Sequence, residues 1–237
     1  MHLVKKFFLS LCIFFGLYQP PTMATDHFPL PKGLYSLGSP EGQRRFTQSQ
    51  HKASYWPLSA HLVTEAYGTY CGIASAVMVL NTLHVPPPED PAHPGFYQWT
   101  QRNIFTPSVR QNLPLKQINR VGLSLSQEGQ LLAQFPLEVH FYYANGQKLI
   151  TFRQQAIRAI DDPNSAIIVH YSRRTLHQAG IGHFSPLAAY DQATDSFLIM
   201  DVARYKYPPT WVPCKQLFRA MRVHGRYRGY VIITGHA

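Results

Sequence analysis

Runs of apolar residues predict helices in the first half of the chain. The run from Gly72 to Leu80 is continuous, and we expect a buried helix over residues 71–83 that the three prolines at 86–88 bring to an end. Other helices in this half are expected at three places: a start at residues 39–41 with Ser39 as the cap, then 114–121 and 126–135.

The second half of the chain has the pattern of strands. Short apolar runs alternate with turn-rich segments, and the expected strands are 137–144, 166–171, 183–190, 197–202 and 229–234. The turn-forming residues 191–195 predict a hairpin. Thr151-Phe152-Arg153-Gln154 predicts a capping box before a helix with Phe152, Ala156, Ile157 and Ile160 on its apolar face. Helices first and antiparallel strands afterwards predict an α+β fold, with a helix packed on one face of the sheet.

The first 24 residues have the pattern of a secretory signal peptide. Lys5 and Lys6 precede an apolar stretch of about 12 residues, and the small Ala24 suits the position before a cut. The stretch is too short to span a bilayer of about 30 Å, and no later stretch is long enough. We therefore expect a secreted or periplasmic protein, with residues 1–24 removed, residues 25–237 as one domain and no stable membrane insertion.

Net charge favours a small anionic partner over nucleic acid. The full sequence has a formal charge of +10, and removal of residues 1–24 leaves 213 residues with a charge of +8. The basic residues are scattered and form no run of five or more. This distribution predicts a basic surface that attracts small anions rather than a nucleic-acid interface.

Cys71 is the candidate nucleophile. It opens the expected buried helix, where partial positive charge and unpaired N–H groups favour a thiolate and a developing oxyanion. The alternative is a buried cysteine that packs as a small apolar side chain. Cys12 leaves with the signal peptide, and we expect Cys71 and Cys214 to be unpaired, since a disulfide would silence the nucleophile.

A cysteine nucleophile needs a base and a group that orients the base. His183 follows the flexible segment Gly180-Ile181-Gly182 and begins an expected strand. Asp201 ends the apolar run of the next strand, so the predicted hairpin would bring the two residues together, and a buried acid usually has a partner. The alternative for Asp201 is a residue that caps the following turn.

Three segments resemble the phytochelatin synthase family. They are residues 70–81 (YCGIASAVMVLN), 182–190 (GHFSPLAAY) and 201–209 (DVARYKYPP), in the family's order. The resemblance implies a papain-like fold for residues 25–237 as one catalytic domain. It also implies that Cys71, His183 and Asp201 are the catalytic cysteine, histidine and aspartate.

The resemblance implies acyl transfer on glutathione. The thiol attacks the Cys–Gly bond, glycine leaves, and a γ-glutamylcysteinyl thioester forms on Cys71. Water then gives γ-glutamylcysteine, whereas a second glutathione gives phytochelatin, a polymer that binds cadmium. Because the chain ends soon after the catalytic segments, it is similar to short bacterial members, and we expect hydrolysis to dominate. No cofactor is required; a heavy-metal ion, Cd or Zn, would enter as a glutathione complex or an activator.

Glu65 departs from the family pattern, which usually has an oxyanion-hole glutamine six residues before the nucleophile. An ionised carboxylate would repel the oxyanion, whereas a protonated one can donate a hydrogen bond. We expect Glu65→Gln to raise turnover at neutral pH; the alternative is that Glu65 points to solvent. The resemblance also implies Arg173 and Arg228 as ligands of substrate carboxylates. Arg204 and Lys206 are candidates for a second-substrate or metal–thiolate site.

Two other functions stay open. A papain-like peptidase on another short peptide would use the same three residues. A non-catalytic exported metal-binding protein would use histidines and Cys214, but the chain has no Cys-x-x-Cys or His-x-x-x-His pair. The partners that we expect are glutathione and related thiol peptides, without nucleic acid, and the sequence leaves open whether the protein forms a homodimer.

Overall fold

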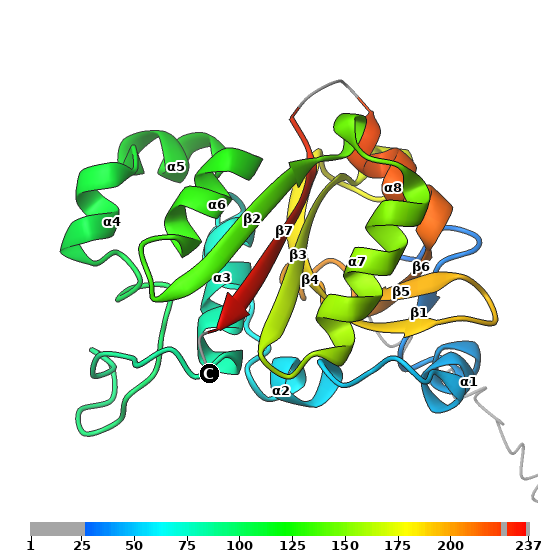
Figure 1. The fold of residues 1–237 in the computed structure, drawn as a ribbon, viewed down its shortest axis with the longest axis horizontal. Coiled ribbons are helices and arrows are strands. Elements are labelled where there is room, and N and C mark those ends of the chain that lie inside the picture. The colour runs from blue at the N-terminus through cyan, green and yellow to red at the C-terminus, as the bar shows by residue number, and fades with distance from the viewer. Residues whose placement is uncertain (1–26, 224–226, 236–237) are drawn as a thin grey trace, which may run out of the picture.

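Seven strands form one antiparallel sheet within residues 27–223 and 227–235, the part of the chain that the computed structural model describes. The strand order is β1-β6-β5-β4-β3-β7-β2 (Figure 1). The strands are β1 (Tyr35–Ser36), β2 (Leu137–Tyr143), β3 (Ser165–Ser172), β4 (Gly182–Asp191), β5 (Ser196–Ile199), β6 (Thr210–Pro213) and β7 (Gly229–Gly235). The expected signal peptide, residues 1–24, lies outside the described residues.

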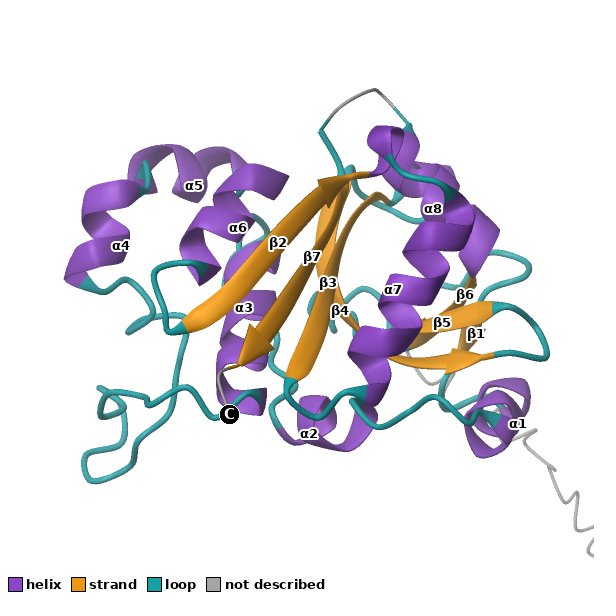
Figure 2. Cartoon of the chain, in the orientation of Figure 1, coloured by secondary structure: helices purple, strands orange, loops and turns teal. Residues whose placement is uncertain are grey.

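Helices cover both faces of the sheet. They are α1 (Pro40–Gln48), α2 (Tyr55–Ala60), α3 (Cys71–Thr82), α4 (Pro107–Asn112), α5 (Leu115–Val121), α6 (Leu125–Leu132), α7 (Leu149–Asp161) and α8 (Cys214–Arg222). Figure 2 shows α7 and α8 against one face and α3 behind the strands. None of the described helices is both long and apolar enough to span a bilayer.

The central strands are apolar on both sides because both sides are covered. Along β3, Ile168 packs in the core around α3, whereas its neighbours Ile167 and Val169 pack in the core around α7 and α8. This alternation follows from the two-residue period of a strand. The expected α+β architecture, with a buried helix packed on an antiparallel sheet, is confirmed.

Most predicted elements are present, but two details of the prediction differ from the structure. The capping box predicted at Thr151 is wrong, because α7 already begins at Leu149, whose side chain packs against the core. A capping box is formed instead by Ser124 and Gln127 at the start of α6. Strand β5 ends at Ile199, short of the predicted residue 202, so Asp201 lies in the segment that follows the strand.

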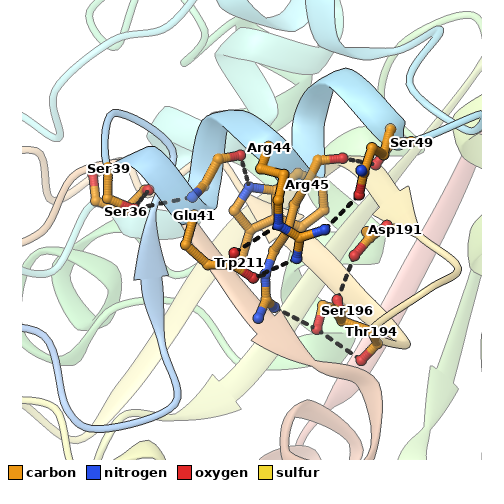
Figure 3. A network of polar contacts seen from close by, with 12 residues as sticks. Ser36, Ser39, Glu41, Arg44, Arg45, Ser49, Asp191, Thr194, Ser196 and Trp211 are labelled. Atoms are coloured by element: carbon orange, nitrogen blue, oxygen red, sulfur yellow. Dashed lines mark hydrogen bonds and ion pairs between the residues drawn. The ribbon is translucent and has the colours of Figure 1, made fainter.

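Helix α1 holds the N-terminal segment on the β4–β5 hairpin (Figure 3). Ser39 caps the helix as predicted, accepting a hydrogen bond from the backbone N–H of Gly42. Arg45 is buried, pairs with Glu41 at 2.8 Å and donates to Ser196 Oγ at 3.1 Å. At the open end of this hairpin, away from its turn, His183 begins β4 and Asp201 follows β5.

Candidate active site

Cys71 is the first residue of α3, as the sequence predicts, and it faces the sheet. The first N–H groups of a helix have no partner inside it, so they remain available beside the thiol. Burial raises the pKa of Cys71 to about 12, and the carboxyls of Glu65 and Glu128 add to this, which opposes the effect expected from the helix N-terminus. The backbone amides of Phe184 and Gly72 lower that pKa, but burial dominates.

His183 and Asp201 form a buried pair next to the thiol. His183 begins the inward-facing part of β4, and its Nε2 lies 2.9 Å from Asp201 Oδ1. Burial lowers the pKa of His183, so its imidazole is neutral at rest. Burial alone would raise the pKa of Asp201, but the charges and hydrogen bonds of His183 and Arg173 lower it to about 2.

Asp201 also caps the turn that follows it. Its Oδ1 accepts a hydrogen bond from the backbone N–H of Ala203 at 2.9 Å, so the turn-capping role that the sequence left open is present together with the contact to His183. One carboxylate therefore fixes both the imidazole and the segment that follows.

Arg173 lines the cavity beside Cys71, but its guanidinium is already paired with Asp201. Its side chain is 2% exposed and its Nη2 contacts both carboxylate oxygens of Asp201 at 2.8 Å. Its Nη1 donates to Gln178 at 3.0 Å, and its guanidinium lies over the ring of Tyr207. Gly180, at φ +116°, allows the loop to close against this side chain. Arg173 thus holds Asp201, and its expected role as a ligand of a substrate carboxylate stays a prediction.

Glu65 points into the site, so the alternative of a solvent-facing side chain is wrong. It is 5% exposed, and its Oε1 accepts a hydrogen bond from the Tyr205 hydroxyl at 2.6 Å. Its Oε2 is buried and has no hydrogen-bond partner among the described residues. Ligand atoms of Glu65, Cys71 and His183 all lie within 4.8 Å of one another, a spacing that could hold a metal ion.

A cavity of about 560 Å³ opens beside Cys71 and His183. Four basic residues and one acidic residue line it: Arg120, Arg173, Lys206, Arg228 and Glu65. Its volume falls in the range of small-molecule sites. The cavity is therefore suited to a small anionic ligand.

Of the other expected basic residues, two line the cavity and one does not. Arg228 lines the cavity; its buried Nε has no partner among the described residues, and its Nη1 donates to the carbonyl of Val223 at 3.1 Å. Lys206 lines the cavity as well. Arg204 is exposed and does not line it, and its role at a second-substrate or metal–thiolate site stays a prediction.

Two residues near the site, His170, which is half-buried, and Glu128, which is buried, were not expected from the sequence. His170 stacks on Phe184 with ring centroids 4.0 Å apart, and burial lowers its pKa to about 3. Glu128, on α6, is fully buried and burial raises its pKa to about 8. A Cβ at Gly72 would lie 2.4 Å from Glu128 Oε2, so glycine at the second position of α3 makes room for this carboxyl group.

Cys214, the second described cysteine, takes no part in the site. It begins α8, is fully buried in the core around α7 and α8, and has a free thiol, as has Cys71. The chemistry therefore centres on one thiol with a neutral imidazole beside it. Such a pair can transfer the thiol proton to the imidazole and carry out acyl transfer.

Comparison with known proteins identifies the family of the chain. A sequence model of a family described as phytochelatin synthase matches residues 25–230. Glutathione gamma-glutamylcysteinyltransferase 3 of Lotus japonicus is 32% identical over 213 residues, 87% of this chain and 43% of that protein. The corresponding protein 2 of Arabidopsis thaliana is 31% identical over 82% of this chain and 43% of its own length.

More distant relatives complete the comparison. The enzyme of the same name from Schizosaccharomyces pombe is 28% identical over 86% of this chain and 50% of its own. The chain thus spans half the length of these relatives or less. Among solved structures, a C39-like peptidase of Bacillus anthracis is similar over 78% of this chain and 98% of its own, with 11% identity and a TM-score of 0.47.

Proposed function

Because this chain belongs to the phytochelatin synthase family, we propose that it cleaves the Cys–Gly bond of glutathione through a thioester on Cys71. One observation carries the proposal. The Cys71–His183–Asp201 group lies beside a cavity lined by Arg120, Lys206 and Arg228 and by one carboxyl, Glu65, while the charge of Arg173 is offset by Asp201. Glutathione is a small peptide with two carboxylates and one ammonium group, so it carries the net negative charge that this lining attracts.

The first half-reaction uses the neutral imidazole as base. His183 takes the proton of the Cys71 thiol as sulfur attacks the carbonyl carbon of the Cys–Gly bond. Asp201, held by Arg173, stabilises the imidazolium that forms. The imidazolium then gives its proton to the nitrogen of glycine, the C–N bond breaks, and a γ-glutamylcysteinyl thioester remains on Cys71.

The raised pKa of Cys71 makes the proton transfer part of the attack. Burial raises the pKa of Cys71 and lowers the pKa of His183, which favours the neutral thiol and imidazole over the ion pair, so in the proposed step the proton moves as sulfur attacks. The oxyanion forms near the first N–H groups of α3 and near Glu65. A protonated Glu65 would donate a hydrogen bond to it, and an ionised one would repel it.

The second half-reaction releases the thioester to water or to a second glutathione. We propose that hydrolysis to γ-glutamylcysteine is the main outcome, with phytochelatin as the product of transfer. A heavy-metal ion takes part only as a glutathione complex, not as the free ion, and the protein works outside the cytoplasm, a proposal that rests on the sequence of residues 1–24. A peptidase acting on another short peptide is the remaining enzyme alternative, since it would use the same triad.

Mass spectrometry of the products tests the proposal. The purified protein is incubated with glutathione, with and without cadmium, beside Cys71→Ser and beside Cys214→Ala as the matched thiol control. We expect glycine and γ-glutamylcysteine from the wild type and from Cys214→Ala, and neither from Cys71→Ser. Longer γ-glutamylcysteine chains would make transfer the main outcome, and the lack of any product that depends on Cys71 would refute the proposal.

A further inference from the structure

The carboxylate of Glu65 lies close to the Cys71 thiol and the His183 imidazole, so three potential metal ligands are grouped there. We propose that Cys71 Sγ, His183 and Glu65 bind one thiophilic divalent cation, such as Zn²⁺ or Cd²⁺, and that this ion blocks the acyl transfer. The binding is argued from geometry alone, and only the blocking rests on the proposed function.

The three ligand atoms are already close enough to surround one ion. They lie within 4.8 Å of one another. Around a tetrahedral zinc ion, with bonds of about 2.0 to 2.3 Å, neighbouring ligand atoms are roughly 3.5 Å apart. Shifts of roughly 1 Å in these atoms would therefore bring them to the spacing of zinc ligands.

Each of the two non-sulfur ligands is oriented by a neighbour. Asp201 holds Nε2 of His183 at 2.9 Å, which leaves the other ring nitrogen for the ion. The hydroxyl of Tyr205 donates to Oε1 of Glu65 at 2.6 Å, which leaves Oε2, buried and unpartnered among the described residues. Hydrogen-bond partners of this kind accompany metal-binding histidines and carboxylates in proteins.

Charge is balanced at the site when the ion is present. A thiolate at Cys71 and a carboxylate at Glu65 offset a divalent cation, while Asp201 is already paired with Arg173. The donor set of sulfur, imidazole nitrogen and carboxylate oxygen is one that zinc accepts. The ion also gives the unpartnered Oε2 of Glu65 the contact that it lacks.

The position of the ion explains why it would inhibit. It would occupy the sulfur lone pair that attacks the substrate and the imidazole nitrogen that takes the proton. The three protein ligands leave a fourth position, which faces the cavity. A water molecule or the thiol of a substrate can fill that position without releasing Cys71.

Binding is measured on the full chain, freed of metal, with Co²⁺ as a spectroscopic probe and Zn²⁺ in competition with a chromogenic chelator. We expect one equivalent of ion and a thiolate-to-Co²⁺ charge-transfer band. Cys71→Ser should abolish the band, and Glu65→Gln should weaken Zn²⁺ binding by at least tenfold. Tyr205→Phe should weaken it by about tenfold, since loss of a supporting hydrogen bond has effects of this size. Cys214→Ala should bind as the wild type does.

A second measurement does not depend on any variant folding. Zn²⁺ in a metal-buffered solution should protect Cys71 of the wild type from alkylation, as read by mass spectrometry of the peptide that contains it. Binding that is unchanged in Cys71→Ser or Glu65→Gln, or alkylation of Cys71 that Zn²⁺ does not slow, would overturn the proposal.

Activity assays separate the two proposals. At buffered free Zn²⁺, glutathione cleavage by the wild type should be inhibited, and Glu65→Gln should need at least tenfold more free ion for the same inhibition. A protein that binds Zn²⁺ at Cys71 but does not cleave glutathione would refute the proposed function and leave the metal site standing. An active protein that stays uninhibited with the site occupied would refute the blocking.

Discussion

Replacing Glu128 with glutamine should remove a pH-dependent penalty on the folded state. Glu128 is fully buried on α6, and neither of its carboxylate oxygens has a hydrogen-bond partner among the described residues. Burial raises its pKa from 4.5 to about 8. The folded protein therefore keeps this proton over a pH range in which the unfolded chain has lost it.

The sign and size of the effect follow from that difference. A carboxyl whose pKa is raised by folding contributes its full stability below pH 4.5, and this contribution falls as pH rises to about 8. The total change is at most about 5 kcal/mol, at about 1.4 kcal/mol for each pKa unit. Between pH 5 and pH 7.5 the wild type should lose about 3 kcal/mol of unfolding free energy that Glu128→Gln keeps.

Urea unfolding at a series of pH values measures this directly. The difference between wild type and Glu128→Gln isolates the one carboxyl, because the other titrating groups are common to both proteins. Glu138→Gln, at an exposed carboxyl on β2, is the matched control and should stay within about 0.5 kcal/mol of the wild type. A difference curve that is flat between pH 5 and pH 7.5 would mean that Glu128 is solvated or paired, and the reasoning would be refuted.

Three further predictions concern the site. Glu65→Gln should raise glutathione turnover at neutral pH and flatten any acidic optimum, and an unchanged pH–rate profile would contradict this. Arg173→Met should destabilise the fold by about 3 to 5 kcal/mol in urea unfolding, because Asp201 keeps a buried charge without its partner; a loss below about 1 kcal/mol would refute that dependence. Arg228→Ala should raise KM for glutathione at least tenfold with kcat nearly unchanged, measured by steady-state kinetics, whereas an equal loss in kcat would place Arg228 in the chemistry.

The backbone framework of the site was predictable because it follows apolar patterns. The buried run after Cys71 indicates a helix start, and two strands joined by a turn bring His183 near Asp201. The direction of side chains in turns has no such period. Lys206 therefore lines the cavity while Arg204 is exposed, although only two positions separate them.

The buried charges near the site were not predictable, since the sequence around each indicates something else. Glu128 stands in the first turn of a helix after the cap Ser124, where an acid is favoured on the surface by the helix dipole. Only the close packing of Gly72 against it shows that it is inside. Arg173 follows a buried strand, and its contact with Asp201 spans 28 positions along the chain, which no local pattern encodes.

The site is assembled from two parts of the fold, the helix α3 and the sheet. Cys71 belongs to the helical layer, whereas His183 and Asp201 belong to the sheet and the segment after it, far along the chain. Neither half carries a base next to the thiol by itself. Cys71 therefore gains a neighbouring imidazole only when α3 docks on the completed sheet, so a chain that is still being made or is partly unfolded carries an ordinary cysteine at this position.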